Sequence, residues 1–237
     1  MSRARLLLLS NSTNYGGEFL AHAANDIRDF LGAAVRRVLF VPFAGVTRSY
    51  DEYAAVVRAR FGELGYQLDS VHETAEPAKT VENAEAIAVG GGNTFHLLRG
   101  LYEAGLIESI RARVGIGTPY VGWSAGSNVA CPTIKTTNDM PIVEPPSFAA
   151  LNLVPFQINP HYTDEMPADH AGETREQRLA EFLKANPDAR VVGLREGSIL
   201  RIEGSEIKLL GAKTARVFKS GADAKEFWPT DSLNFLL

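Results

Sequence analysis

The sequence predicts a three-layer α/β sandwich with a mostly parallel central sheet and extra short strands near the C-terminus. Two observations indicate this fold class. Short, continuously apolar runs alternate with segments in which apolar residues recur at helical spacing. Continuously apolar strands are typical of parallel sheets that helices cover on both faces. Because the 237 residues contain no linker, internal repeat or low-complexity tract, we predict a single domain over residues 1–237.

The first two thirds of the chain contain the alternating units. Residues 5–9 form an apolar run, which we assign to a buried first strand because polar residues follow at once. This run is too short for the apolar core of a signal peptide, and no stretch approaches the roughly 20 apolar residues of a membrane span. The predicted strands are residues 5–9, 38–41, 66–71, 84–89 and 120–123, and the predicted helices are residues 17–31, 49–64, 94–102 and 107–114.

The last third of the chain has a different pattern. Residues 131–148 are rich in Pro, Thr and Asn and are predicted to form an ordered loop. A strand over residues 154–158 leads to His161, and a helix follows over residues 173–184. Further short strands are predicted at residues 190–194, 198–202, 206–210 and 216–219, with a hairpin turn at residues 204–205.

Composition narrows the possible partners and compartments. The net charge is −4, so the chain has no basic excess for phosphate backbones, and we expect no nucleic-acid partner. Its one cysteine, Cys131, permits neither an intrachain disulfide nor a zinc site built from thiolates. A single cysteine fits a reducing compartment, and we expect a cytoplasmic protein.

A G-x-S-x-G pattern lies at residues 122–126, directly after the apolar residues Tyr120 and Val121. In this pattern a serine lies on a tight strand-to-helix turn, and small neighbours let the backbone lift the hydroxyl clear of the sheet. Ser124 is therefore a candidate nucleophile. Its assignment depends on a base, an orienting acid and an oxyanion site elsewhere in the chain.

A nucleophilic serine requires a general base, which is usually histidine. The candidates are His22, His72, His96, His161 and His170. His22 and His96 lie within helical patterns, and His72 follows a weak strand. His161 follows a predicted strand and the stiff Pro160, which presents its imidazole from a constrained loop. We therefore assign the base to His161.

Two carboxylates compete for the role of orienting the histidine. Glu196 follows the predicted strand 190–194 and comes after His161 in the chain. Asp139 lies in a polar loop between Ser124 and His161. Spacing alone does not decide between the two.

The oxyanion site requires backbone amides that point at the developing charge. Ala125 directly follows Ser124 and supplies one amide. The other comes from the segment 90–93, because its glycines allow a close approach of the backbone. A nucleotide loop is the competing interpretation, but Phe95 occupies the third glycine position of G-x-G-x-x-G, and no G-x-x-x-x-G-K-[ST] is present.

Two other enzyme classes fit the sequence less well. In α/β-hydrolases the histidine comes last and near the C-terminus, whereas several predicted strands follow His170 here. Cysteine-dependent amidotransferases need a cysteine at the turn where this chain has Ser124. Cys131 comes too late in the chain for that role and is predicted to be a small buried residue.

The chain resembles the peptidase E family of serine peptidases, the aspartyl dipeptidases. The resemblance covers the middle of the chain densely and in the family's order, at residues 90–93, 122–126, 130–143, 157–162 and 172–178. It implies a fold like that of the class I glutamine amidotransferases. It also implies hydrolysis of dipeptides with an N-terminal aspartate, with no metal or other cofactor.

The resemblance also implies roles for individual residues. Ser124 would be the nucleophile, His161 the base and Glu196 the orienting acid, with Asp139 as the alternative acid. The oxyanion hole would consist of the amides of Gly92 and Ala125.

Substrate recognition would involve Arg175, which matches an arginine thought to bind the aspartyl carboxylate. A guanidinium suits that task because it donates two parallel hydrogen bonds. We also assign Asn93 to substrate binding. One position departs from the family: Arg195 precedes Glu196, where relatives have proline, and an ion pair between these two would pull Glu196 away from the base.

We therefore expect a cytoplasmic, metal-independent serine dipeptidase for Asp-Xaa dipeptides, either a monomer or a homodimer, with no nucleic-acid or membrane partner. The first rival hypothesis is a hydrolase of β-aspartyl linkages, of the cyanophycinase type. The second is a non-catalytic domain that binds a small molecule and retains the serine turn. A general esterase is disfavoured by the chain order of the candidate residues.

Overall fold

The central sheet contains seven strands in the order β3-β2-β4-β5-β1-β8-β9, in a computed structural model that describes residues 4–165 and 171–237. Strands β1 to β5 are parallel, whereas β8 and β9 are antiparallel to their neighbours. The carboxyl ends of the parallel strands therefore meet at one edge. The strands are β1 (Arg5–Leu9), β2 (Arg37–Val41), β3 (Gln67–Ser70), β4 (Ile87–Val89), β5 (Tyr120–Trp123), β8 (Ile199–Glu203) and β9 (Glu206–Leu210).

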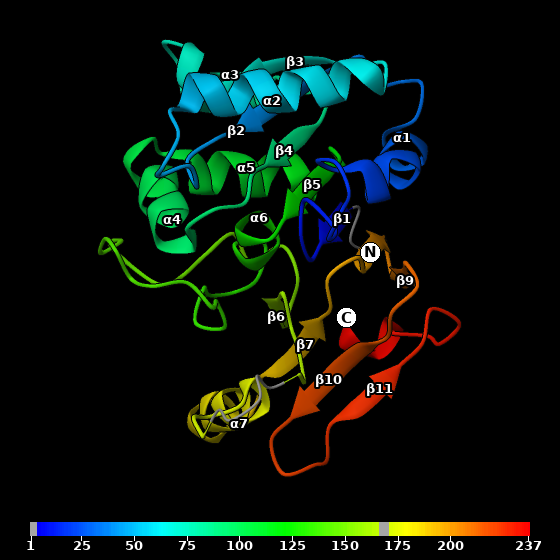
Figure 1. Ribbon diagram of the computed structural model, residues 1–237. Helices are drawn as coiled ribbons and strands as arrows, with labels where there is room; N and C mark the ends of the chain where they lie inside the picture. The colour runs from blue at the N-terminus through cyan, green and yellow to red at the C-terminus, as the bar shows by residue number, and fades with distance from the viewer. Residues whose placement is uncertain (1–3, 166–170) are drawn as a thin grey trace.

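Helices cover both faces of this sheet (Figure 1). The leucines of strand β1 explain this arrangement, because they face two separate cores in alternation. Leu7 and Leu9 pack on one face of the sheet, and Leu6 and Leu8 pack on the other. One face is covered by α1 (Ala24–Leu31) and α2 (Tyr50–Glu63), and the other by α3 (Pro77–Glu82), α4 (Thr94–Glu103) and α5 (Leu106–Gly115). The three-layer α/β sandwich with a mostly parallel sheet is thus confirmed.

A second sheet of four strands lies beside the first, at the opposite end of the molecule from α2 in Figure 1. Its order is β11-β10-β7-β6, and only β6 and β7 are parallel. Helix α7 (Arg175–Ala185) packs on it through Leu179 and Leu183. The strands are β6 (Gln157–Pro160), β7 (Arg190–Leu194), β10 (Ala215–Lys219) and β11 (Lys225–Phe227).

Local sequence explains where the longer helices begin. Ser49 accepts a hydrogen bond from the amide of Glu52, and the Glu52 side chain accepts one from the amide of Ser49, which is a capping box at the start of α2. Thr174 and Gln177 form the same arrangement at the start of α7.

Three predicted elements differ from the structure, and one of them is the strand expected over residues 84–89, which spans only Ile87–Val89. The helix expected over residues 17–31 is α-helical only over Ala24–Leu31, with a 3-10 turn at Ala21–Ala23 before it. Leu20 has a left-handed backbone (φ 53°), and its amide donates to the carbonyl of Ser12, so the α-helix cannot extend through it. The strand expected over residues 154–158 lies at Gln157–Pro160, where its partner is β7.

Several short elements carried no usable pattern in the sequence. These are α3, the four-residue helix α6 (Ala125–Asn128) and strand β11. Each is shorter than the window over which hydrophobic periodicity is visible. The predicted hairpin turn at residues 204–205 is confirmed, since Glu203 pairs with Glu206 across it.

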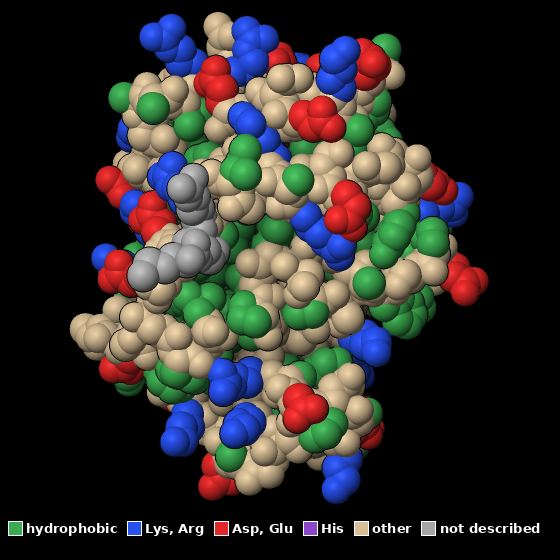
Figure 2. Space-filling view, turned by 180° about the vertical axis from the view of Figure 1, so that it is seen from behind, with side chains coloured by type: hydrophobic (Ala, Val, Ile, Leu, Met, Phe, Trp, Pro, Cys, Tyr) green, Lys and Arg blue, Asp and Glu red, His purple; other side chains and the backbone are tan. Residues whose placement is uncertain are grey.

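The exterior of the molecule carries charges of both signs. On the face that Figure 2 shows, Lys and Arg side chains are interspersed with Asp and Glu, in keeping with the small net charge of −4. Among the helices of the described residues, none has both the length and the apolar character that crossing a membrane requires.

Candidate active site

Ser124 lies on the turn between β5 and α6, at the carboxyl edge of the central sheet. Its backbone has φ 52° and ψ −112°, a conformation that residues with a side chain rarely adopt. The turn is possible because Gly126 follows closely: a Cβ there would collide with the carbonyl oxygen of Val89. The G-x-S-x-G pattern thus lies on a strained strand-to-helix turn, as the sequence predicts.

His161 directly follows β6 and reaches Ser124 from the second sheet. Its Nε2 lies 2.8 Å from the Oγ of Ser124. The backbone of His161 is also left-handed (φ 53°) and is fixed by its amide, which donates to the Oγ of Ser10 over 2.9 Å. That hydroxyl donates in turn to the carbonyl of Leu194 over 2.7 Å, so strands β1, β6 and β7 together position the imidazole.

Glu196 completes a line of hydrogen bonds. Its Oε1 lies 2.7 Å from the Nδ1 of His161. A carboxylate only accepts hydrogen bonds, so Nδ1 carries the proton and Nε2 accepts the hydroxyl proton of Ser124. The turn that presents Glu196 is held by the amide of Gly197, which donates to Asn11 over 2.8 Å.

Asp139, the alternative acid, occupies a different place. Its Oδ2 accepts hydrogen bonds from the amide and hydroxyl of Thr94, over 2.7 and 2.5 Å, and from the hydroxyl of Thr137 over 3.1 Å. Asp139 forms no hydrogen bond with His161, since the Nδ1 of that ring is taken by Glu196 and its Nε2 by Ser124. The geometry therefore favours Glu196 as the partner of the histidine.

Arg195 does not form the ion pair with Glu196 that its position in the sequence allows. Its guanidinium pairs with Asp164 over 2.8 Å and with Glu226 over 2.9 Å, and lies over the ring of Tyr162. The hydrogen bond that Arg195 donates to Glu226 raises the pKa of Arg195. Arg195 therefore pairs with other carboxylates, and Glu196 is available to bond with His161.

The glycine run 90–92 passes close to Ser124. A Cβ at Gly91 would lie 3.0 Å from the Cβ of Ser124, and one at Gly92 (φ +137°) would collide with the carbonyl of Ala44. Gly92 cannot be replaced without a clash, and a side chain at Gly91 would be tightly packed. The amide of Gly92 has no acceptor among the described residues, and the amide of Ala125 is in the first turn of α6, where amides have no partner within the helix.

A pocket of about 320 Å³ opens at this edge of the sheet. Its lining includes Ser124, His161, Gly92 and Asp139, and residues that the sequence analysis did not single out, among them Ser12, Arg48 and Tyr53. Such a volume is at the lower end of the range for small-ligand sites, about 300–1,000 Å³. The pocket therefore suits a small substrate.

Arg175 lies at the start of α7 and reaches this region through Asn138. Its Nη1 donates to the Oδ1 of Asn138, a residue that lines the pocket. Arg175 is half-buried, and within the described part of the chain no carboxylate pairs with it. Burial, with a smaller contribution from the charge of Arg178, lowers its pKa.

Asn93 does not line the pocket. Its Oδ1 accepts from the amide of His96 and caps α4, and its Nδ2 donates to the carbonyl of Met140 over 2.9 Å. Both ends of this amide are thus used within the protein, and its assignment to substrate binding stays a prediction.

The remaining histidines and the cysteine are elsewhere. Ser124 bonds to none of His22, His72 and His96, and His170 lies outside the described residues. Cys131 is fully buried, and burial raises the pKa of its thiol to about 12. Such a thiol is not a nucleophile near neutral pH.

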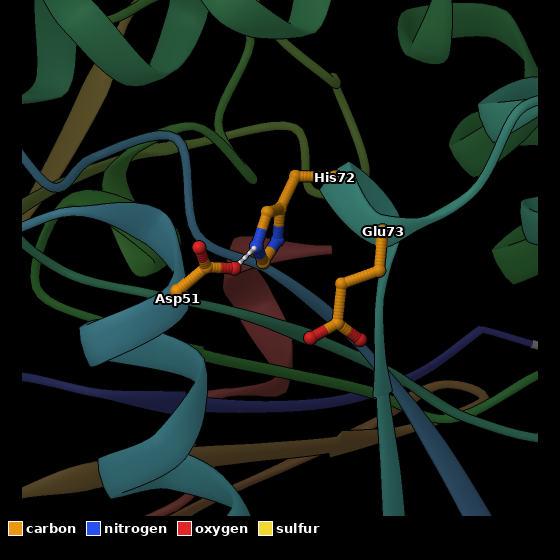
Figure 3. A group of neighbouring side chains, drawn as sticks. All are labelled: Asp51, His72 and Glu73. Atoms are coloured by element: carbon orange, nitrogen blue, oxygen red, sulfur yellow. Dashed lines mark hydrogen bonds and ion pairs between the residues drawn. The ribbon is translucent and has the colours of Figure 1, made fainter.

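One group of possible metal ligands occurs among residues 4–165 and 171–237, namely Asp51, His72 and Glu73 (Figure 3). Each side chain already has a partner. The Nε2 of His72 lies 2.9 Å from Asp51, and both oxygens of Glu73 accept hydrogen bonds from Arg58, over 3.0 and 2.9 Å. Ion pairs therefore account for the group.

Comparison with known proteins places these features in a family. The model of peptidase family S51 matches residues 6–210. A peptidase E of Nostoc sp. is 57% identical over 98% of this chain and 96% of its own length, and one of Escherichia coli O6:K15:H31 is 48% identical over 92% and 95%.

Two solved structures share the fold. A putative peptidase E from Listeria monocytogenes has a TM-score of 0.67 at 22% identity, over 88% of this chain and 98% of its own. A peptidase from an acI-B1 actinobacterium has a TM-score of 0.71 at 17% identity, over 98% and 97%. The class I glutamine amidotransferase-like arrangement that the sequence resemblance implied is compatible with this fold.

Proposed function

This chain belongs to peptidase family S51 and is a serine dipeptidase, and we propose that its substrates are dipeptides that begin with aspartate. The proposal has two parts. Ser124, His161 and Glu196 form the catalytic triad, and Arg175 selects the aspartyl side chain. The single observation that carries the proposal is the hydrogen-bonded line from Ser124 through His161 to Glu196.

In the first half of the reaction, His161 takes the proton of the Ser124 hydroxyl as the oxygen attacks the peptide carbonyl. The negative charge that forms on the carbonyl oxygen is stabilised by the amides of Gly92 and Ala125. His161 then donates the proton to the leaving amine, and the aspartyl group stays bound to Ser124 as an ester. Glu196 stabilises the imidazolium that exists between these two transfers.

In the second half, His161 takes a proton from a water molecule that attacks the ester. The same amides stabilise the second oxyanion. Collapse of this intermediate returns the proton to Ser124 and releases aspartate. Every proton transfer uses the Nε2 of His161, which lies 2.8 Å from the Oγ of Ser124.

The aspartyl specificity is proposed from the state of Arg175. Among residues 4–165 and 171–237, the half-buried guanidinium of Arg175 bonds to an amide oxygen and to no carboxylate that would compensate its burial. A carboxylate of the substrate supplies that charge and can accept two parallel hydrogen bonds. Asp139 is fixed by three donors in the same pocket, and we propose that it faces the ammonium group of the substrate.

The two rival hypotheses are a hydrolase with another substrate and a domain without catalytic activity. A hydrolase of β-aspartyl linkages would use the same nucleophile on an isopeptide bond, and the family assignment does not favour it. A non-catalytic binding domain is disfavoured for the same reason.

The test is hydrolysis of Asp-Leu, Asn-Leu, Leu-Leu and β-Asp-Arg by the wild type and by Ser124→Ala, with and without a chelator. We expect the wild type to cleave Asp-Leu in preference to the other three, the chelator to have no effect, and the variant to be inactive. Preferred cleavage of β-Asp-Arg would replace the proposal by the isopeptide alternative, and equal cleavage of Leu-Leu would remove the aspartyl specificity.

A further inference from the structure

Arg48 is a cation in the pocket lining, and among the described residues no carboxylate pairs with it. It lies in the loop between β2 and α2 and lines the same pocket as Ser124. Within the described ranges no salt bridge involves its guanidinium. The nearby carboxylate of Glu52 is committed to Ser49 in the capping box of α2. An exposed arginine in a small pocket is thus free to meet a substrate.

The position of this guanidinium is well defined. It lies over the ring of Tyr53, 4.2 Å from the ring centroid, a distance at which cations are attracted to aromatic faces. Tyr53 is itself fixed, since its hydroxyl donates to the carbonyl of Gly91 over 2.9 Å and accepts from the indole of Trp123 over 3.0 Å. Tyr53, on which the Arg48 guanidinium lies, is therefore hydrogen-bonded to the glycine run beside Ser124.

Arg48 and Arg175 reach the pocket from different elements, the β2–α2 loop and helix α7. Tyr53, under Arg48, belongs to the core that α1 and α2 form on one face of the central sheet. Asp139, next to Asn138 and Arg175, is bound to the first residue of α4, which covers the other face. Ser124 lies at the sheet edge between the two faces. The pocket lining therefore includes the guanidinium of Arg48, and Arg175 reaches the pocket from α7 through Asn138.

A dipeptide that begins with aspartate carries two carboxylates, on opposite sides of the bond that is cleaved. One is the aspartyl side chain, and the other is the free C-terminus of the second residue. With Arg175 assigned to the first, Arg48 remains for the second. We propose that Arg48 binds the C-terminal carboxylate of the dipeptide and thereby restricts cleavage to dipeptides. This inference rests on the proposed function.

The restriction to dipeptides follows from chain geometry. Each further residue moves the terminal carboxylate by about 3.3–3.6 Å and leaves an uncharged amide in its place. In a tripeptide, Arg48 then faces a group that cannot form an ion pair, and the side of the pocket toward Tyr53 must also hold another residue. Both effects weaken the transition-state complex of longer peptides relative to that of the dipeptide.

The test compares kcat/KM for Asp-Leu, its C-terminal amide and Asp-Leu-Ala in the full-length protein. The variants are Arg48→Met, which keeps length and removes charge, and Arg48→Lys, which keeps charge. Arg36→Ala is the matched control, because this exposed arginine precedes β2 at the opposite end of the strand from Arg48. A thermal melt of each variant verifies folding.

We expect the wild type to prefer Asp-Leu over its amide and over Asp-Leu-Ala. Arg48→Met lowers that preference about tenfold to a hundredfold, the range of a charge-assisted hydrogen bond. Arg48→Lys retains part of it, and Arg36→Ala retains all of it. If Arg48→Met cleaves Asp-Leu and keeps the wild-type preference, the inference is wrong while the proposed function stands. If the wild type cleaves neither Asp-Leu nor its amide, both fall together.

Discussion

In the part of the chain that the structure describes, two histidines lie between a serine hydroxyl and a carboxylate. His161 lies 2.8 Å from Ser124 and 2.7 Å from Glu196. His72 lies 2.7 Å from the hydroxyl of Ser70 and 2.9 Å from Asp51, the contact that Figure 3 draws. The distances of the two arrangements are nearly the same, so distance does not distinguish them.

Their surroundings differ. Ser124 lies on a left-handed turn, lines the pocket and has the amides of Gly92 and Ala125 beside it. Ser70 is fully buried at the end of β3, an ordinary strand. A serine, a histidine and a carboxylate in line therefore do not by themselves make a catalytic site. The strained turn, the free amides and the access for a substrate are also required.

The largest expected effect comes from removing the hydroxyl of Ser124. Ser124→Ala is expected to lower kcat for Asp-Leu by about 10⁴-fold or more, because no other group can form the acyl-enzyme. Ser70→Ala removes the hydroxyl of the other line and is the matched control, with kcat within about twofold of the wild type. Steady-state hydrolysis measures both. A comparable loss in Ser70→Ala would break the distinction between the two lines.

The next effect separates the two candidate acids. Glu196→Gln leaves an amide that cannot stabilise the imidazolium of His161, and we expect kcat to fall by about 10²–10⁴-fold. Asp139→Asn is expected to act mainly on KM, through the ammonium group of the substrate. Initial rates over a range of Asp-Leu concentrations separate kcat from KM. A larger fall in kcat for Asp139→Asn than for Glu196→Gln would mean that Asp139, and not Glu196, is the acid of the catalytic triad.

A smaller and selective effect is expected at Arg175. Arg175→Met removes the cation proposed for the aspartyl carboxylate, so kcat/KM for Asp-Leu should fall about 10²-fold, while Asn-Leu changes little. Arg178→Met is the control, because this exposed neighbour on α7 pairs with Glu173 instead. Competition between Asp-Leu and Asn-Leu gives the preference directly. An unchanged preference in Arg175→Met would remove this role.

The smallest effect on activity is expected from changes in the hydrogen-bonded group Ser70, His72 and Asp51, which we do not consider catalytic. His72→Ala removes hydrogen bonds to Ser70 and Asp51, and we expect the free energy of unfolding to fall by about 1 kcal/mol. Activity on Asp-Leu should stay within about twofold of the wild type. Urea denaturation and initial rates measure the two quantities. A loss of activity without a loss of stability would mean that this histidine takes part in the reaction.

Most of the central fold could be predicted from the sequence, because the apolar pattern within each segment is enough to indicate a strand or a helix. The leucines of β1 are fully buried, and their continuous apolar run indicates a strand covered on both faces. The second sheet could not be predicted. The runs that become β6 and β7 look like those of the first sheet, and only long-range contacts, such as the hydrogen bond from Ser10 to Leu194, determine their place.

The candidate site could be predicted only where a motif fixes the backbone. Ser124 and Gly92 lie in patterns whose geometry is tied to glycine, and these patterns indicate the turn and the loop. The choice of Glu196 over Asp139 depends on how the two sheets pack against each other. The spacing of residues in the sequence does not reveal that packing. Arg48 was missed, although it lies in a loop after a predicted strand, the kind of place where sites form in parallel sheets.

Labelling with a fluorophosphonate, followed by mapping of the modified residue by mass spectrometry, shows which of the two serines is a nucleophile. Such a reagent reacts with a serine that a histidine activates beside an oxyanion hole. We expect one adduct, on Ser124, lost in Ser124→Ala and retained in Ser70→Ala. An adduct on Ser70, or no adduct on Ser124 in a protein that cleaves Asp-Leu, would contradict the account.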